Sequence, residues 1–391
     1  MGWWAYRLSG SVAWLAAVGV CSQLPILLFG PWAASVSDRI ERRKGVMTTQ
    51  ALSLLQALAL CILYASGQGQ MWQVVALSLF LGVVNTFDIP IRQSYASHLV
   101  PAEDLKNSVA INALFSNMIR LIAPAVGGIV IAKWGEGYCF AANTLSFLGI
   151  LFSLSRLKKQ KAHEDNDMEI GVWTGFAQGA AHARKSHAIV AGLAMAFCIS
   201  LFATPYLTLM PALAKSSFGA GAREFGFAMG ASGVGAMLAG LVQAASPSMM
   251  RARSIPWLGA LGGASLAAMA SMPNIYWAMP WLALVGFGLA GAASTTSVLV
   301  QTNSAPNMRG RVLGMFSMCM YGGAPLGMLA FGMLAEHAGT RFSVAFGGAL
   351  CAIGCAGLGF WMKAGALKRK AIRDARIAGG DMVKDEAIQT V

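Results

Sequence analysis

The chain has 391 residues, of which 56% are hydrophobic and only 12% are charged, and its formal net charge is +13. Apolar stretches of about twenty residues recur along it, which is the length that a helix needs to cross the hydrocarbon of a bilayer. A large soluble core would need helices with one polar face, whereas segments such as 51–65 and 282–292 are apolar on every side. The composition therefore excludes a soluble globular domain and predicts a protein that crosses the membrane many times.

The chain opens with MGWWAYRL, which is too short to cross a membrane. Trp3, Trp4 and Tyr6 are typical of the interfacial end of a transmembrane helix, so we expect this stretch to be the last part of a truncated first helix. No signal-peptide pattern precedes the apolar runs. Hydropathy and turn residues then predict eleven complete spans, at 12–34, 46–65, 71–91, 108–132, 139–156, 187–211, 224–245, 256–272, 276–301, 311–335 and 342–363.

The basic residues outside the spans lie mostly on alternate connections. Lys and Arg gather at 39–44, at 156–161 and in the C-terminal tail, whereas the connections of the other set carry few, such as Arg7 and Lys133. An excess of Lys and Arg marks the cytoplasmic loops of membrane proteins. We therefore expect the basic connections, the central loop and the C-terminus to be cytoplasmic, and the net charge to contact anionic lipid headgroups rather than nucleic acid.

The longest polar connection, 157–186, divides the spans into two comparable parts. An offset of 201 residues places Ala123-Pro124 on Ala324-Pro325, in helices that each follow a polar loop. These features predict duplicated halves, an architecture that alternating-access transporters use. The predicted organisation is a helical half at 1–156, a central loop at 157–186, a second half at 187–364 and a tail at 365–391.

The stretch ASVSDRIERR at 34–43 resembles the loop between helices two and three of the major facilitator superfamily, whose pattern is Gly-x-Leu-Ala-Asp-Arg-x-Gly-Arg-Arg/Lys. Asp38, Arg39, Arg42 and Arg43 match this pattern. Glu41 stands where the pattern has its second glycine. An acidic residue at this position is common in the bacterial drug and siderophore exporter branch, so the chain resembles this enterobactin-exporter-like branch. The alternative is a solvated, positively charged loop, which accounts for the arginines but not for an aspartate at the membrane edge.

The resemblance implies an all-α integral membrane protein of the major facilitator fold. It would have two six-helix pseudo-symmetric halves, with the first helix truncated here and about 11 complete spans. It also implies that the loop is a gate, in which Asp38 meets the cytoplasmic start of helix eleven, here 308–313, when the transporter faces outward. An anion near a helix N-terminus gains about 0.3–1 kcal/mol at an exposed site, which is enough to bias a nearly balanced equilibrium.

A second motif, RLIAPAVGG at 120–128, resembles the Gly-Pro-x-x-Gly-Gly signature in helix five of proton-coupled exporters of this superfamily. Pro124, Gly127 and Gly128 match, and Ala123 replaces the first glycine. Small residues let helices approach closely, and proline loosens the backbone hydrogen bonds of a helix that must bend. The alternative is ordinary tight packing between helices.

Two charged residues are predicted to lie inside the membrane. Arg120 falls about 18 Å into its helix, where a charge costs at least about 2.5–3.5 kcal/mol unless it faces water or a partner. Asp88, the one carboxylate that we place well inside a span, is its candidate partner. The pair either joins two helices laterally or serves substrate binding or proton coupling, and we favour the second interpretation. Pro90 and Arg92 resemble the Pro-x-Arg-Gln that follows helix four in the exporter branch.

Further polar residues at membrane depth are candidates for lining a substrate cavity, although each one alone more often makes a hydrogen bond between helices. Pro205 and Pro211, six residues apart, also predict a kinked or broken helix seven. The polar residues singled out are Asn85, Asn117, Thr204, Tyr206 and Tyr321.

These features predict a secondary transporter of the bacterial cytoplasmic membrane that exports a small amphipathic molecule, such as a drug or siderophore, against protons re-entering the cell. The chain has no Walker-type glycine loop and its five histidines are dispersed, so we expect no ATP hydrolysis, no enzyme activity, and no metal or other cofactor. The expected partners are the substrate, protons and membrane lipids but no nucleic acid, and we expect a monomer. A non-transporting scaffold or sensor derived from a transporter, and a lipid translocator, stay open as alternatives.

Overall fold

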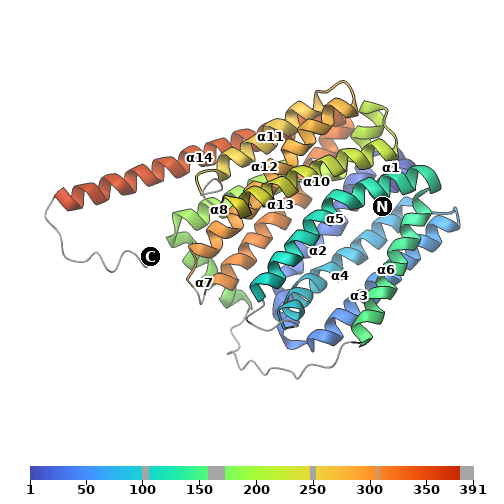
Figure 1. The fold of residues 1–391 in the computed structure, drawn as a ribbon, viewed down its shortest axis with the longest axis horizontal. Helices are drawn as coiled ribbons and strands as arrows, with labels where there is room; N and C mark the ends of the chain where they lie inside the picture. The colour runs from blue at the N-terminus through green and yellow to red at the C-terminus, as the bar shows by residue number, and fades with distance from the viewer. Residues whose placement is uncertain (99–104, 157–171, 247–251, 306–307, 379–391) are drawn as a thin grey trace.

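The computed structural model describes residues 1–98, 105–156, 172–246, 252–305 and 308–378, and every regular element in these ranges is a helix. The long helices run side by side in one bundle, and α14 reaches beyond it (Figure 1). The N-terminal half consists of α1 Gly2–Ser9, α2 Val12–Arg39, α3 Arg42–Ala65, α4 Met71–His98, α5 Leu105–Trp134 and α6 Glu136–Arg156. After α7 Val172–Lys185, the C-terminal half consists of α8 His187–Cys198, α9 Tyr206–Ala212, α10 Ala222–Ala245, α11 Ile255–Ala270, α12 Ile275–Thr302, α13 Arg309–Ala338 and α14 Thr340–Ala378.

Each predicted span corresponds to helical residues of the structure. Within the described ranges, nine helical segments are long and apolar enough to cross a membrane, with His187–Ser217 counted as one. The apolar stretches Leu121–Trp134 in α5 and Ile255–Ala270 in α11 are shorter and complete the eleven predicted spans. The opening stretch forms α1, which ends at Gly10 with φ 64°, a left-handed conformation that favours glycine.

The seventh predicted helix is irregular, as its two prolines indicate. Two π-helical segments, η1 Ile199–Ala203 and η2 Leu213–Ser217, lie on either side of α9. Pro205 directly precedes α9 and lacks the N–H that a continuous helix would use. The prediction of a broken helix is therefore confirmed.

The two halves repeat the same packing pattern. In the N-terminal half, α2 packs on α4 and α5 packs on α6. The equivalent helices of the C-terminal half form the same pairs, α10 with α12 and α13 with α14. Helix α3 contacts α4 and α6, as α11 contacts α12 and α14. The sequence repeat pairs α5 with α13, and both helices contain a proline at the repeated position. The predicted duplication therefore agrees with this pattern of helix contacts.

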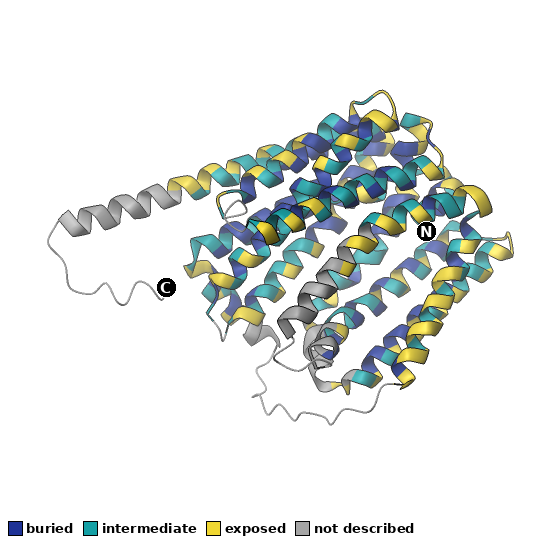
Figure 2. Cartoon of the chain, viewed as in Figure 1, coloured by how far each residue is buried: buried dark blue, intermediate teal, exposed yellow. Residues whose placement is uncertain are grey.

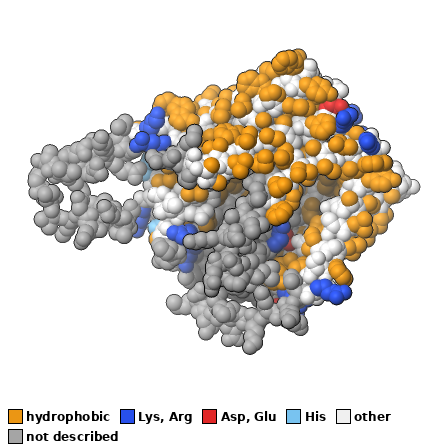
Figure 3. Space-filling view, viewed as in Figure 1, with side chains coloured by type: hydrophobic (Ala, Val, Ile, Leu, Met, Phe, Trp, Pro, Cys, Tyr) orange, Lys and Arg blue, Asp and Glu red, His pale blue; other side chains and the backbone are white. Residues whose placement is uncertain are grey.

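The surface of the bundle is rich in large apolar side chains, as a membrane protein requires. Examples are Trp72, Leu145 and Ile353, which are 61%, 66% and 69% exposed. Buried residues lie between the helices and exposed residues on their outer faces (Figure 2). Hydrophobic side chains cover most of the described face in Figure 3. These exposed residues fit contact with lipid tails.

The bundle has two ends that differ in charge. At the end that we call the basic end, α2 finishes at Arg39, α6 finishes at Arg156 and α13 begins at Arg309. At the other end, here called the opposite end, the turns between α1 and α2, between α5 and α6 and between α13 and α14 contain Gly10, Gly135 and Gly339. The sequence predicts that the basic end is cytoplasmic.

The two halves contact each other mainly along two helix pairs, α2 with α13 and α5 with α10, and α1 and α2 also contact α9. Gly128 of α5 approaches α10 so closely that a methyl group on it would lie 2.6 Å from the Ala222 carbonyl oxygen. A methyl group on Gly332 of α13 would lie 2.5 Å from the Cβ of Ala16 in α2. All four residues lie in the part of their helix that is nearer the opposite end.

Candidate functional site

Asp88 is the centre of a buried polar network near the basic end. Its side chain belongs to α4, and the residue is 4% exposed. Oδ1 accepts hydrogen bonds from Thr49 Oγ1 at 2.7 Å and from Gln50 Nε2 at 2.8 Å. Oδ2 forms an ion pair with Arg92 Nε, one turn further along α4, at 3.2 Å. Both carboxylate oxygens therefore have partners.

The cation beside Asp88 is Arg92, whose side chain is 63% exposed. The sequence suggested Arg120 as the partner, but the Arg120 side chain lies outside the described residues, so that pairing stays a prediction. Asn85, one turn before Asp88, is half-buried. The ion pair with Arg92 can neutralise Asp88 without a second helix, because residues four apart are neighbours on a helix.

Sequence reasoning missed the two α3 residues that bind Asp88. Thr49 and Gln50 are only 5% and 6% exposed. The sequence does contain a pattern that indicates them. The polar residues Thr49, Ser53 and Gln56 recur every three or four positions within an apolar helix, and in the structure all three are buried. Such spacing places polar groups on one face of a transmembrane helix, where they need a partner on a neighbouring helix.

Only one member of the predicted gate motif has a described side chain. The guanidinium of Arg43 donates from Nη2 to the carbonyl oxygens of Leu154 at 3.1 Å and Ser155 at 3.0 Å. These carbonyls belong to the last turn of α6, where a cation is favoured by the helix dipole and by the unpaired carbonyls. Arg43 therefore joins the start of α3 to the end of α6. The side chains of Asp38, Arg39 and Arg42 lie outside the described residues.

The start of α13, where the gate hypothesis places the contact with Asp38, is held by other elements. Arg309 Nε donates to the Gln301 carbonyl oxygen of α12 at 3.1 Å. Arg311 donates to the side-chain oxygen of Gln178 in α7, and a methyl group on Gly179 would lie 3.1 Å from the Arg311 Cβ. Both arginines are thus bound within α7 and the C-terminal half.

The helix-five motif lies where the halves meet. Gly128 and the Pro124 carbonyl both face Gly226 of α10, since a methyl group on Gly226 would lie 2.5 Å from that carbonyl oxygen. Gly127 points elsewhere, because a methyl group on it would meet no atom within 4 Å. Two of the three predicted residues therefore shape the contact between α5 and α10.

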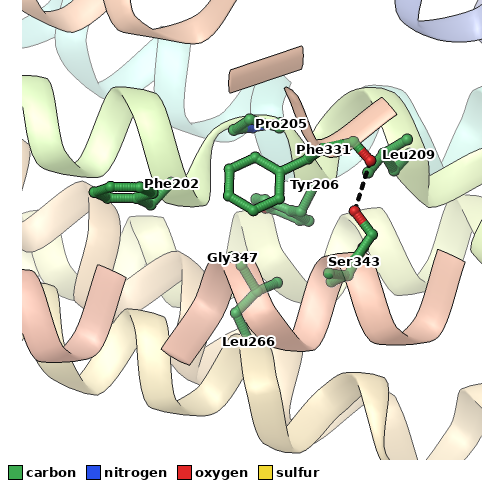
Figure 4. Close-up of a pocket in the computed structure, with 9 residues that line it drawn as sticks. Phe202, Pro205, Tyr206, Leu209, Leu266, Phe331, Ser343 and Gly347 are labelled. Atoms are coloured by element: carbon green, nitrogen blue, oxygen red, sulfur yellow. Dashed lines mark hydrogen bonds between the residues drawn. The ribbon is translucent and has the colours of Figure 1, made fainter. Parts of the chain in front are cut away.

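The candidates on the seventh predicted helix lie mainly within the C-terminal half. Tyr206 is buried, and its hydroxyl is 3.2 Å from the Ser232 hydroxyl of α10. Beside it is a mainly apolar cavity of about 10 Å³, close to the smallest volume that holds one water molecule. Its walls include Phe202, Phe331 and Ser343, whose hydroxyl donates to the Phe331 carbonyl (Figure 4).

The remaining polar candidates have different surroundings. The Thr204 hydroxyl donates to the Ile199 carbonyl at 3.4 Å, within its own irregular helix. Tyr321 on α13 is 43% exposed. The Asn117 side chain lies outside the described residues. The structure therefore does not bring these candidates together with Asp88 in one described cluster.

Sequence reasoning also missed Glu136, because the predicted span begins three residues later. Glu136 is the first residue of α6 and is 2% exposed. Its Oε2 is 3.0 Å from Arg7 Nη2 and accepts a hydrogen bond from the Tyr64 hydroxyl at 3.1 Å. In the sequence, a glutamate between Gly135 and Gly137 is typical of an exposed turn, so nothing in the local pattern indicated its burial.

Comparison with known proteins identifies the family. Residues 1–374 match the family described as transmembrane secretion effector. The chain belongs to this family of major facilitator superfamily transporters. The match confirms the predicted superfamily, and since the family consists of transporters, it also confirms that the chain is not an enzyme.

Relatives of similar length are transporters of small molecules. The staphyloferrin A transporter of Staphylococcus aureus is 24% identical over 86% of this chain and 84% of its own. The multidrug efflux pump Tap of Mycolicibacterium fortuitum is 24% identical over 87% and 85%. The enterobactin exporter EntS of Salmonella typhimurium is 24% identical over 76% and 72%. This member of the transmembrane secretion effector family is therefore a multi-pass membrane transporter with a small-molecule substrate.

Solved structures confirm the predicted fold. A point mutant of the nucleoside transporter NupG superimposes with a TM-score of 0.72 over 91% of this chain and 93% of its own, at 13% identity. A bacterial homologue of the iron transporter ferroportin in an inward-facing state gives a TM-score of 0.68 over 92% and 94%, at 16% identity. These likenesses concern the fold alone.

Proposed function

We propose that this transporter exports a small amphipathic molecule, such as a drug or a siderophore, from the bacterial cytoplasm in exchange for protons. The observation that carries the proposal is the Asp88 network, a buried carboxylate whose partners are two neutral donors and one exposed guanidinium. The names of two relatives, a multidrug efflux pump and an enterobactin exporter, support the direction and the substrate class.

Asp88 would couple the proton to the substrate through Arg92. While Asp88 is ionised, it holds the Arg92 guanidinium at 3.2 Å. Protonation of Asp88 would remove this attraction and leave Arg92, which is largely exposed, able to bind an anionic group of the substrate. Proton and substrate would then act on one ion pair, which is the linkage that antiport requires.

Alternating access would use the contacts between the halves. Two close approaches between the halves, Gly128 with Ala222 and Ala16 with Gly332, lie toward the opposite end, while Gly322 meets Leu27 near the middle of the bundle, and we assign the basic end to the cytoplasm. The proposal includes a monomer in the inner membrane, surrounded by lipid, with the connection 157–186 and the tail 365–391 in the cytoplasm.

The decisive experiment compares Asp88→Asn with the unchanged chain in inverted vesicles, with a fluorescent cationic dye and an anionic catecholate as probes. We expect Asp88→Asn to lose proton-driven accumulation of the probe and to retain exchange of probe across the membrane without a proton gradient. The matched control is Glu224→Gln, because the Glu224 carboxylate only caps α10 through the Gly221 N–H at 2.9 Å.

Retention of proton-driven accumulation by Asp88→Asn would refute the role of Asp88. If neither probe moves while the chain is folded, the non-transporting scaffold becomes the better interpretation. Movement of labelled phospholipid in place of both probes would favour a lipid translocator.

A further inference from the structure

A second buried carboxylate lies at the opposite end of the bundle, where α1, α3 and α6 meet. Oε2 of Glu136 receives the Arg7 guanidinium and the Tyr64 hydroxyl. Oε1 is buried and has no hydrogen-bond partner. An unpartnered buried oxygen of an ionised group is costly, and protonation of the carboxyl group relieves that cost.

The surroundings of Glu136 exclude water on one side and admit it on the other. The rings of Trp4, Tyr64 and Phe140 pack edge to face against one another, with centroids 5.5 to 5.6 Å apart. The Arg7 side chain, in contrast, is 50% exposed. A proton from this end of the bundle can therefore reach the carboxylate beside Arg7, without passing the aromatic cluster.

Helix α1 connects this carboxylate to the contact between the two halves. Its Trp3 ring stacks on Phe225 of α10 in the C-terminal half, with centroids 5.3 Å apart. Its Gly2 is close to Pro211 of the same half, since a methyl group on Gly2 would lie 3.8 Å from the proline ring. One short helix thus carries both the cation that pairs with Glu136 and an aromatic contact between the halves.

The equivalent junction of the C-terminal half is built without a carboxylate among its described residues. There, the Thr340 hydroxyl at the start of α14 is 3.3 Å and 3.1 Å from the hydroxyls of Ser216 and Ser217. Arg341 donates to the carbonyl oxygens of Ser217 and Met272, each at 3.1 Å. These bonds involve hydroxyl and guanidinium groups, whose charge does not change between neutral and mildly acidic pH, whereas a carboxyl group gains a proton in acid.

We propose that Glu136 is a proton-binding site that controls the contact between the two halves at the opposite end. When Glu136 is ionised, it holds Arg7 and therefore α1, and Trp3 stays on Phe225. When it is protonated, the ion pair is lost, α1 turns about Gly10, and Trp3 leaves Phe225. The inference rests on the proposed function only for its orientation, in which this end faces outward and meets the protons that drive export.

Other charged groups near Glu136 bear on the same response. The groups that face it from the described residues are Arg7 and the amino group of Met1 in α1, Tyr64 in α3 and Cys139 in its own helix. Among these, Glu136 is the one carboxyl group, while burial lowers the pKa of the Met1 amino group, so the Glu136→Gln variant is needed to separate the two responses.

The test measures the distance between α1 and α10 directly. In Phe225→Cys the new thiol carries a bimane label, whose fluorescence Trp3 quenches on contact. The same labelling of the chain without Phe225→Cys provides the background from its native cysteines. We expect the fluorescence to rise as the pH of the purified full chain falls from about 7 to about 4, the range in which glutamate side chains take up a proton. We expect it to be high at every pH in Glu136→Gln.

Two further variants make the result decisive. Arg7→Gln removes the pair from its exposed side, so it should give the same constant high fluorescence even if Glu136→Gln does not fold. Glu224→Gln, a carboxylate next to the label, should keep the full pH response. A pH response that survives in Glu136→Gln or Arg7→Gln, or its absence in the unchanged folded chain, would overturn the inference. Because no substrate is present, this outcome is independent of the Asp88→Asn result.

Discussion

A carboxylate buried in a membrane bundle has to be neutralised by its neighbours, and Asp88 and Glu136 have different neighbours. Asp88 is bound by α3 and by Arg92 of its own helix, so its partners among the described residues lie on two adjacent helices. Glu136 pairs with a cation on α1, which also contacts the other half. In the two proposals, protonation of Asp88 changes the charge on a binding group, whereas protonation of Glu136 releases a helix.

The hydrogen bond from Thr49 to Asp88 makes a testable contribution to stability. Among the described residues, Thr49→Val leaves Oδ1 of Asp88 with Gln50 as its remaining donor. Loss of a hydrogen bond to a charged group costs about 1.5–3 kcal/mol, so we expect a drop of this size in the free energy of unfolding, measured by denaturation in detergent. Thr48→Val is the matched control, because Thr48 is the neighbouring, exposed residue.

A double-mutant cycle assigns that cost to the pair itself. In an Asp88→Asn background, Thr49→Val should cost less than in the unchanged chain, because the acceptor is no longer charged. Equal costs in both backgrounds would show that the Thr49 hydroxyl donates instead to its alternative acceptor, the Val46 carbonyl oxygen at 3.0 Å.

At the scale of helices, the spans could be predicted because their apolar runs have the length of the membrane, and Pro205 and Pro211 revealed the broken helix. Helix α7 was not predicted, since its fourteen residues mix polar and apolar types and lie in the polar connection 157–186. The burial of Glu136 could not be predicted, because it depends on how α1 and α3 close over the start of α6. The Asp88 site was predicted in part. Its α4 residues are neighbours in the sequence, whereas its α3 donors can be assigned only when the packing of α3 on α4 is known.

The contact between α5 and α10 leads to a prediction with an internal control. Gly128→Ala would place a methyl group 2.6 Å from the Ala222 carbonyl oxygen, so the two helices must separate. Overpacking of this kind costs about 1–3 kcal/mol, and we expect both slower transport and a longer distance between spin labels on α5 and α10 at the opposite end.

Gly127→Ala is the matched control for this variant. It adds the same methyl group to the same helix, where no atom lies within 4 Å of it. If the two variants slow transport equally, the close approach of α5 to α10 is not what makes Gly128 necessary.

For the whole molecule, the described contacts join the halves from the opposite end to the middle of the bundle, and alternating access needs a competing contact at the basic end. The gate hypothesis assigns it to Asp38 and the start of α13. In this structure Arg309 and Arg311 are occupied by Gln301 and Gln178. Closure of the basic end would therefore exchange bonds that lie within α7 and the C-terminal half for bonds between the halves.

Asp38→Asn tests this exchange. An aspartate near the start of α13 stabilises the closed basic end by about 0.3–1 kcal/mol, so its loss should shift the equilibrium about two- to fivefold toward the state open at that end. We expect slower transport with unchanged unfolding in detergent, and a larger fraction of long distances between spin labels on α2 and α13 at the basic end. Asp38→Glu, which keeps the charge, should restore much of the closed fraction. A normal transport rate in Asp38→Asn would instead show that the loop only carries the positive charge that orients the chain in the membrane.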